Sequence, residues 1–325
     1  MKKELKIKKI LIVSNMVMTC LYLSLSSYGV WVPDAWDVYP EEFYKIYEIS
    51  SKYSTKEMDL KRLTVSNFKN HSYKPNPVVE GLQLDILARQ FKQDSRNEDV
   101  VGWIYVPKTN INYPIVKHPT DTNFYAKRNY EKFENTKKDY GFPGVIWIDS
   151  NCKFENIGDL SENTVLYGHN WENYTDNPKK DDFRDIMFSQ LNSFHHFDYA
   201  KERPYIYISS LDKTIPLKIF SVFYTEDEFH YHITNPNEEE KLYIIKEALE
   251  RSRFVYDSPV YITDKIFTFS TCTRAYGKGR ADQKFVIMAR PLRDDESVND
   301  ELSNTYLTIH KNHKEPTLKK TPPKK

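Results

Sequence analysis

The stretch "DKIFTFSTCTRAYGKGRADQKF", residues 264–285, is the most informative part of this sequence. In "IFTFSTC" the side chains of a strand alternate, so Phe267 and Phe269 should face one side and Cys272 the other. Four basic residues follow the cysteine: Arg274, Lys278, Arg280 and Lys284. Positive charge near a thiol stabilises the thiolate, which is the nucleophilic form. The sequence thus predicts a reactive Cys272, and the competing interpretation is a small buried hydrophobic residue.

Composition excludes several classes of protein. The chain has 325 residues, a formal net charge of +1 and only 9 glycines, so neither a nucleic-acid partner nor a phosphate-binding glycine loop is expected. The three cysteines, Cys20, Cys152 and Cys272, lie far apart in the sequence, and their odd number leaves at least one thiol unpaired within the chain. No CxxC, H-E-x-x-H or G-x-S-x-G motif is present. We expect no metal and no cofactor.

The N-terminus predicts attachment to a membrane. Residues 1–9 are basic, and residues 10–32 contain no charged side chain. A helix needs about 20 apolar residues to cross a bilayer, so we expect an uncleaved, single-pass signal-anchor at 10–32, with a cleavable signal peptide as the alternative. The basic start places 1–9 in the cytoplasm and the rest outside. Residues 33–78 are interpreted as a stalk.

The rest of the chain is rich in short strands. Apolar residues at helical spacing predict an amphipathic helix over 79–91. Strands are predicted within 100–106, 113–116, 144–150, 163–167, 203–210, 215–225, 260–272 and 284–292. Seven or eight short strands with few helices indicate a mostly β fold, a closed or nearly closed barrel.

Residues 235–252 interrupt the strands with a predicted surface helix. Asn235 is the expected N-cap, with Pro236 at the first helical position. Leu242, Ile245 and Leu249 are expected to line its buried face. At the other end of the chain, residues 296–325 are expected to be a disordered basic tail, which leaves 79–295 as the catalytic domain.

A cysteine nucleophile usually has a histidine partner, and His169 is the candidate. It ends the predicted strand "TVLYGHN" directly after Gly168, a residue that permits a tight turn. The paired histidines at 195–196 and at 230 and 232 are interpreted as surface residues. His169 has two possible roles: a general acid and base, or the imidazolium partner of a Cys272 thiolate.

Four segments in order carry a resemblance to a known family. "TFSTC" resembles the TLxTC signature of sortases, and "YGHN" resembles the histidine segment of class B sortases. "DVVGWIYVPKTNINYPIV" is similar to the class B entry into the barrel, and the helix at 235–252 to the class B insertion before the cysteine strand. The match covers about residues 79–292. Phe269 stands where the signature usually has leucine.

The resemblance implies a sortase-type β-barrel of about eight strands and an extracytoplasmic cysteine transpeptidase without cofactor. Such an enzyme cleaves a C-terminal sorting motif of a secreted protein after threonine, through a thioacyl-enzyme on Cys272. An amine of a peptidoglycan precursor or of a pilin then resolves the intermediate. Two alternatives stay open: a cysteine hydrolase with the same intermediate, and a non-catalytic surface domain serving as a pilus accessory module.

The family also has a catalytic arginine near the start of the strand after the cysteine. Counting back from the strand "FVIMAR" points to Lys284, whereas counting forward from Cys272 points to Arg280. Arginine donates two parallel hydrogen bonds and lysine acts as a point charge, so we choose Arg280. Ser270 and Thr271 are candidate substrate contacts, with a structural role in the strand as the alternative. Asp227 and Glu228 are interpreted as a solvated loop.

Overall fold

The computed structural model describes residues 83–134, 145–170, 173, 177–180, 182, 185–277, 282–298 and 307–318. The predicted basic segment 1–9, signal-anchor 10–32 and stalk 33–78 lie outside these ranges. Among the helices that are described, none combines the length and the apolar character needed to span a bilayer.

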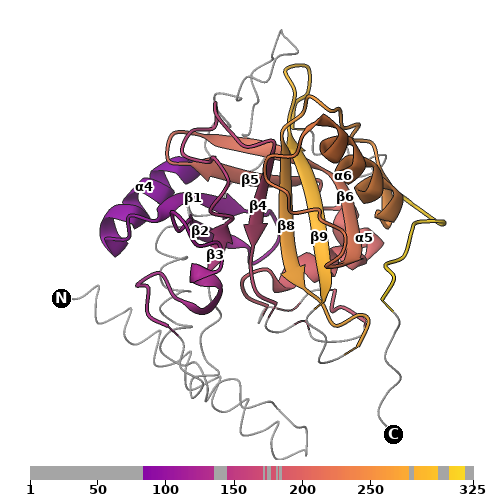
Figure 1. Cartoon of the computed structure of the whole chain (residues 1–325), viewed down its shortest axis with the longest axis horizontal. Helices are drawn as coiled ribbons and strands as arrows, with labels where there is room; N and C mark the ends of the chain where they lie inside the picture. The colour runs from indigo at the N-terminus through magenta and orange to yellow at the C-terminus, as the bar shows by residue number, and fades with distance from the viewer. Residues whose placement is uncertain are drawn as a thin grey trace, which may run out of the picture.

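Eight strands close into a barrel, which confirms the predicted fold class (Figure 1). Their order around the barrel is β1-β2-β3-β4-β8-β9-β6-β5, and β5 pairs with β1 to close it. Only the pairs β2–β3 and β4–β8 are parallel. The strands are β1 (Val100–Tyr105), β2 (Asn112–Val116), β3 (Ile146–Ile148), β4 (Asn163–Tyr167), β5 (Tyr205–Ser210), β6 (Thr214–Glu226), β8 (Ile266–Cys272) and β9 (Gln283–Pro291).

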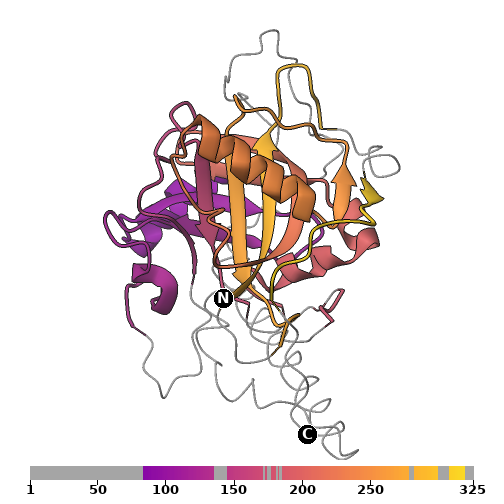
Figure 2. The ribbon, with the colours of Figure 1, turned by 45° about the vertical axis from the view of Figure 1, so that its right-hand side comes forward.

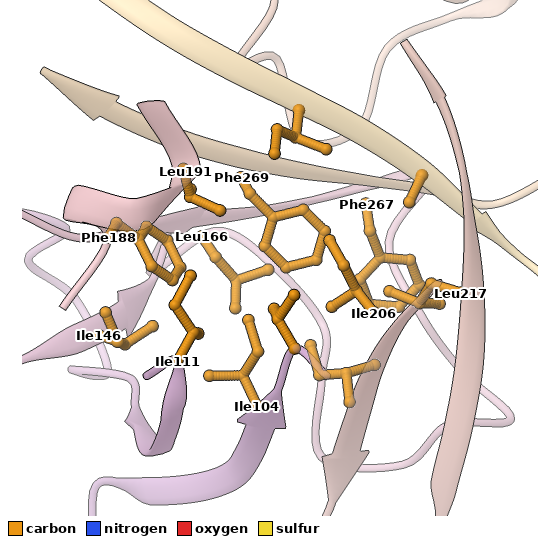
Figure 3. Packing of buried hydrophobic residues seen from close by; sticks show 14 of the residues in the cluster. Ile104, Ile111, Ile146, Leu166, Phe188, Leu191, Ile206, Leu217, Phe267 and Phe269 are labelled. Atoms are coloured by element: carbon orange, nitrogen blue, oxygen red, sulfur yellow. The ribbon is translucent and has the colours of Figure 1, made fainter. Parts of the chain in front are cut away.

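Apolar side chains fill the inside of the barrel. Figure 3 shows Phe267 and Phe269 of β8 pointing inward, toward side chains such as Ile104 and Ile206 from the opposite wall. All four are fully buried. The two phenylalanines explain why this stretch specifies the fold, because burying one such side chain contributes about 1.5–3 kcal/mol. The alternation predicted for the strand is confirmed.

Helices cover the outside of the barrel. α4 (Leu84–Ser95) packs against β1 through Leu84, Ala88 and Phe91. A helix is therefore present in the predicted stretch, but its buried face differs from the predicted one, because Ile86, one of the apolar residues of the predicted spacing, is 44% exposed. α6 (Glu238–Arg251) crosses the outer face of the barrel over β6, β8 and β9 (Figure 2). The described residues also form three short elements: η2 (Phe124–Lys127), η3 (Ser189–His195) and α5 (Phe197–Lys201).

The predicted details of the inserted helix are partly wrong. Asn237, not Asn235, is the N-cap: its side chain accepts from the Glu240 N–H at 3.0 Å, and the Glu240 carboxylate accepts from the Asn237 N–H at 2.8 Å. This reciprocal capping box outcompetes an isolated N-cap two residues earlier. Of the three predicted apolar positions, only Ile245 is buried, while Leu242 and Leu249 are 59% and 42% exposed.

The buried stripe of α6 includes a lysine, which is why the sequence pattern predicts the wrong face. Ile244, Ile245 and Ala248 share this stripe with Lys241, whose ammonium lies 2.5 Å from the Glu162 carboxylate. A lysine stem packs like an apolar side chain when its charged end reaches a partner.

The expectation of disorder is wrong for part of the C-terminal tail. β10 (Leu307–Ile309) pairs antiparallel with β7 (Phe254–Tyr256), and Leu307 and Leu318 are buried. Glu296 is also ordered, because its carboxylate receives two hydrogen bonds, at 2.6 and 2.7 Å, from the fully buried guanidinium of Arg290. Charged residues of the tail thus find charged partners on the body of the protein, which a polar composition does not reveal.

Candidate active site

The last residue of β8 carries the predicted nucleophile. Cys272 is half-buried, and it lies on the strand face opposite to Phe267 and Phe269. Its neighbour on that face, Ser270, is buried and its hydroxyl lies 2.8 Å from the Tyr231 hydroxyl. The end of a barrel strand holds a side chain rigidly while leaving it accessible, as a nucleophile requires.

Two amide side chains hold the main chain at Cys272. Asn170 Nδ2 donates to the Cys272 carbonyl at 3.0 Å, and Asn192 Nδ2 donates to the same oxygen at 3.2 Å. Asn192 is fully buried and Asn170 is 5% exposed. Both amides therefore contribute well-shielded hydrogen bonds that fix the end of β8 against the segments that carry them.

The candidate histidine lies at the corresponding end of the neighbouring strand. β4 runs parallel to β8 with Tyr167 opposite Ser270, and the Gly168 N–H donates to the Ser270 carbonyl at 3.3 Å. The Thr271 hydroxyl donates to the Gly168 carbonyl at 2.8 Å. Since adjacent parallel strands end at the same edge of a sheet, His169 and Cys272 leave their strands side by side.

Gly168 is required for space. A Cβ at this position would lie 2.6 Å from both the Ile146 and Phe188 side chains. The residue does not have the positive φ that would call for glycine on conformational grounds. The glycine before His169 therefore allows the end of β4 to lie in close contact with Ile146 of β3 and with Phe188, the residue before η3, whereas the sequence suggested a tight turn.

The side chain of His169 is held in one orientation. Its Nε2 lies 2.7 Å from the Ala126 carbonyl, and its ring lies 5.5 Å from the Trp147 ring, centroid to centroid. A carbonyl oxygen only accepts, so Nε2 carries a proton and a neutral His169 has its lone pair on Nδ1. Burial lowers the pKa of His169 below its ordinary value, and the Ala126 hydrogen bond offsets only part of that effect. The neutral imidazole is therefore favoured.

Of the two basic candidates, the described part of the chain contains only Lys284. It lies directly opposite Cys272 in the β8–β9 ladder, so the two side chains share one face of the sheet. Its ammonium lies 3.0 Å from Asp227, a 57% exposed carboxylate. The sequence thus missed a contact for Asp227, which it placed in a solvated loop. Arg280 lies outside the described residues.

The second described cysteine, Cys152, has the opposite environment. It is 2% exposed; its thiol faces the Asn163 carbonyl at 3.6 Å and accepts from the Val165 N–H at 3.4 Å. Burial raises the pKa of the Cys152 thiol to about 12. A thiol that stays protonated in the interior is unreactive, so Cys152 packs as a small hydrophobic residue.

Within the described ranges, no group of three or more His, Cys, Asp or Glu side chains could hold a metal ion. Asn170 and Asn192 are the site residues that sequence reasoning missed. Asn170 directly follows His169 in the segment "YGHN", so its place in the sequence could have identified it as a site residue. Asn192 comes from η3, 80 residues before Cys272, and nothing in its local sequence points to the thiol.

The barrel and the strand-end thiol beside a histidine-bearing strand define a cysteine enzyme. The sortase domain family matches residues 104–292. Sortase B of Staphylococcus aureus is 27% identical over 198 residues, which is 61% of this chain and 72% of that protein. Sortase B of Listeria monocytogenes is 30% identical over 188 residues, 57% of this chain and 68% of that protein.

Solved structures agree with these sequence matches. The X-ray structure of Clostridium perfringens sortase B aligns with a TM-score of 0.51 and 26% identity, over 63% of this chain and 98% of that one. The Staphylococcus aureus sortase B–substrate complex aligns with a TM-score of 0.57 at 20% identity, over 78% and 97%, and supports the fold. The chain belongs to the sortase family, in its class B, and is a sortase-type cysteine transpeptidase.

Proposed function

We propose that the chain cleaves a C-terminal sorting motif after threonine, through a thioacyl-enzyme on Cys272, and transfers the protein to an amine of the cell wall or of a pilin. The observation that carries the proposal is the half-buried thiol of Cys272 at the end of β8, where Asn170 and Asn192 hold the backbone carbonyl of the same residue. Two related structures support it: one is a sortase B–substrate complex, and the other is a sortase B complexed with a glycine tripeptide, which ends in an amine.

His169 is proposed as the proton carrier. Its lowered pKa favours the neutral imidazole, which supports an acid–base role over a permanent imidazolium paired with a thiolate. In the first half of the reaction the neutral His169 takes the proton of the Cys272 thiol as the sulfur attacks the threonine carbonyl, and it gives that proton to the leaving amine as the peptide bond breaks. In the second half His169 takes a proton from the incoming amine and returns it to the Cys272 sulfur as the thioester bond breaks, which restores the resting state.

Arg280 is proposed as the donor to the substrate carbonyl oxygen, on which negative charge builds in both steps. A guanidinium offers two parallel N–H groups, and such donors typically matter by about 10²–10³ in rate. Lys284 is the alternative, since the strand register places it opposite Cys272. Ser270 and Thr271 are proposed substrate contacts on the same strand, although both hydroxyls already hold Tyr231 and Gly168.

Four variants separate the two basic candidates. If Arg280 is the donor, Arg280→Lys loses most of the donor's contribution to kcat/KM, which is a factor of about 10². Lys284→Ala then has a mild effect. If Lys284 is the donor, Lys284→Ala is crippling, Lys284→Arg is tolerated, and Arg280→Ala resembles a surface change. A near-wild-type Arg280→Lys enzyme would refute the choice of Arg280.

The proposed reaction is tested by screening the purified chain against a library of sorting-motif peptides, with and without amine acceptors. A transpeptidase forms the amide product when the amine is present. A hydrolase releases the free acid at the same rate under both conditions. A non-catalytic accessory domain consumes no peptide at all, and each of these last two outcomes would refute transfer to an amine.

The proposed location is the outer face of the cell membrane, with residues 10–32 as a retained anchor. The uncharged run behind a basic start supports this location. N-terminal sequencing of membrane-extracted protein tests it, because a mature chain that starts near Tyr28 would show a cleaved signal peptide instead.

A further inference from the structure

The C-terminal strap, defined here as residues 307–318, lies beyond the sortase domain match, which ends at residue 292. It begins as β10, which extends the sheet edge of β7. The His310 N–H then donates to the Arg253 carbonyl at 3.0 Å, and His310 Nδ1 lies 2.8 Å from the Ser252 carbonyl. With Leu307 only 3% exposed, this half of the strap is docked on the body of the protein.

The middle of the strap is fixed to the end of α6. The Lys314 N–H donates to the Glu250 carbonyl at 2.8 Å, and the Lys314 ammonium lies 2.7 and 2.8 Å from the two oxygens of Glu247. Glu247 also accepts from Arg251 at 2.9 Å, and Arg251 binds Glu226 at 2.8 and 3.0 Å. Alternating charges thus connect the strap through α6 to the end of β6.

The far half of the strap reaches the loop that follows Cys272. The Tyr276 hydroxyl donates to Glu315 Oε2 at 2.5 Å, and His313 Nε2 lies 2.9 Å from Glu315 Oε1. Burial alone would raise the pKa of Glu315, but its bond with Tyr276 and the neighbouring His313 lower it, so the carboxylate is ionised near neutral pH. A hydrogen bond to an ionised acceptor is stronger than a neutral one.

Tyr276 transmits this contact toward the thiol. The ring is 8% exposed and packs edge-on against Tyr224 at 5.5 Å, and Tyr224 packs against Phe285 at 4.8 Å. Phe285 pairs with Thr271, the residue before Cys272. The Tyr276 N–H is bound within the loop as well, to Gln283 Oε1 at 3.0 Å. The tyrosine is therefore fixed from inside the loop and from the strap.

A second contact of the strap reaches the other side of the site. The Thr317 N–H donates to Glu226 Oε2 at 3.3 Å, and Glu226 is the last residue of β6. The next residue, Asp227, holds Lys284, which lies opposite Cys272. The strap therefore touches both the β6 end and the β8–β9 loop.

We propose that Glu315 is a positioning residue of the transpeptidase, which holds the loop after Cys272 through the Tyr276 hydroxyl. The inference rests on the proposed function of Cys272 and deepens it. Glu315 takes no part in the chemistry itself: it acts on a loop position four residues from the thiol. If the loop were released from the strap, the thiol would stay in place, but the loop residues around it would no longer be held in fixed positions. The rate of the reaction would then fall.

The test uses single and double variants of the full-length chain. Tyr276→Phe keeps the packed ring and removes the hydroxyl, and Glu315→Ala removes the acceptor. Each should lower kcat/KM by about tenfold, mainly through kcat, because small misplacements near a reacting group are costly. The double variant should be no worse than either single variant, since both remove the same contact. Glu315→Gln keeps an acceptor oxygen and should recover most of the activity.

Lys311→Ala, at an exposed position of the strap, is the matched control and should behave as wild type. The rate at which a methanethiosulfonate reagent labels Cys272 is the second readout. It should change in Tyr276→Phe and Glu315→Ala even when melting temperatures match wild type.

Unchanged labelling and unchanged kcat/KM in both single variants would overturn the role of Glu315, as would fully additive losses in the double variant. The labelling rate separates the two proposals, because it does not require turnover. If the variants label at an altered rate but wild type shows no turnover, the proposed function is refuted, while the effect of Glu315 on the loop after Cys272 stands. If wild type turns over the peptide and both single variants keep its kcat/KM and its labelling rate, the role of Glu315 is refuted and the proposed function of Cys272 stands.

Discussion

The carbonyl of Cys272 accepts two amide hydrogen bonds. The side chains that donate them position the end of β8, although the sequence does not single them out. Asn192→Asp keeps the shape of the side chain, but its carboxylate cannot donate and repels the carbonyl. We expect a loss of stability of about 1–3 kcal/mol, as for an unsatisfied buried group, and a fall in kcat at nearly constant KM. Asn235→Asp, at an exposed amide, is the control for steady-state kinetics and urea unfolding. Equal effects of the two substitutions would contradict the role of Asn192.

His169 gives the fold a pH dependence that can be measured. An unfolded histidine has a pKa of about 6.5, and burial lowers the pKa of His169 in the folded chain. The unfolded state therefore binds the proton more readily, so the contribution is present above about pH 6.5 and is lost as the pH falls through the folded pKa. Urea unfolding at pH 7.5 and 5.5 should show a smaller loss for His169→Gln than for wild type. The exposed His230→Gln is the control, and an identical loss in all three proteins would rule out this effect.

At the scale of elements, the end of β4 depends on the missing side chain of Gly168. In Gly168→Ala the new methyl group meets Ile146 and Phe188, and overpacking of this kind costs about 1–3 kcal/mol. His169 follows directly, so activity should fall by more than the loss of folded protein explains. Gly158→Ala, at an exposed glycine whose Cβ would meet only the Asn156 side chain, should be nearly neutral in melting temperature and rate. An active, fully stable Gly168→Ala protein would show that the contact relaxes easily.

The elements also show what the sequence could predict. Strand alternation in "IFTFSTC" and the apolar runs around it were enough for the barrel, because each strand buries at least one face on its own. The face of α6 was mispredicted because Lys241 buries its stem through an ion pair with Glu162, a residue 79 positions away. Asn192 and the C-terminal strap were missed for the same reason. Their partners are distant in sequence, and polar residues carry no periodic signal.

In the molecule as a whole, the ion pair between Arg290 of β9 and Glu296 holds the start of the C-terminal tail onto the barrel. Burial would raise the pKa of Glu296, but the Arg290 guanidinium outweighs this and lowers the pKa to about 2. Breaking a buried pair leaves an uncompensated charge, so Glu296→Gln should destabilise the protein by about 3 kcal/mol at pH 7. A lowered carboxylate pKa means that wild type keeps this stabilisation above the ordinary value of 4.5 and loses it as the pH falls toward 2.

Denaturant unfolding between pH 7 and pH 3 measures this effect, and the two proteins should converge in stability as the pH falls. Glu98→Gln, at an 87% exposed side chain, is the control and should change stability by less than about 1 kcal/mol. A constant gap between Glu296→Gln and wild type across this range would mean that the charge of Glu296 is not what stabilises the tail.

Acylation of Cys272 is the step on which the proposed transpeptidation depends. The most direct measurement is mass mapping of the full-length chain after incubation with a sorting-motif peptide and no amine. We expect a hydroxylamine-sensitive acyl group on the peptide that contains Cys272, present in wild type and Cys152→Ala, and absent in a folded Cys272→Ala protein. Turnover of the peptide without acylation of Cys272, or an acyl-enzyme that persists in Cys272→Ala, would contradict this expectation.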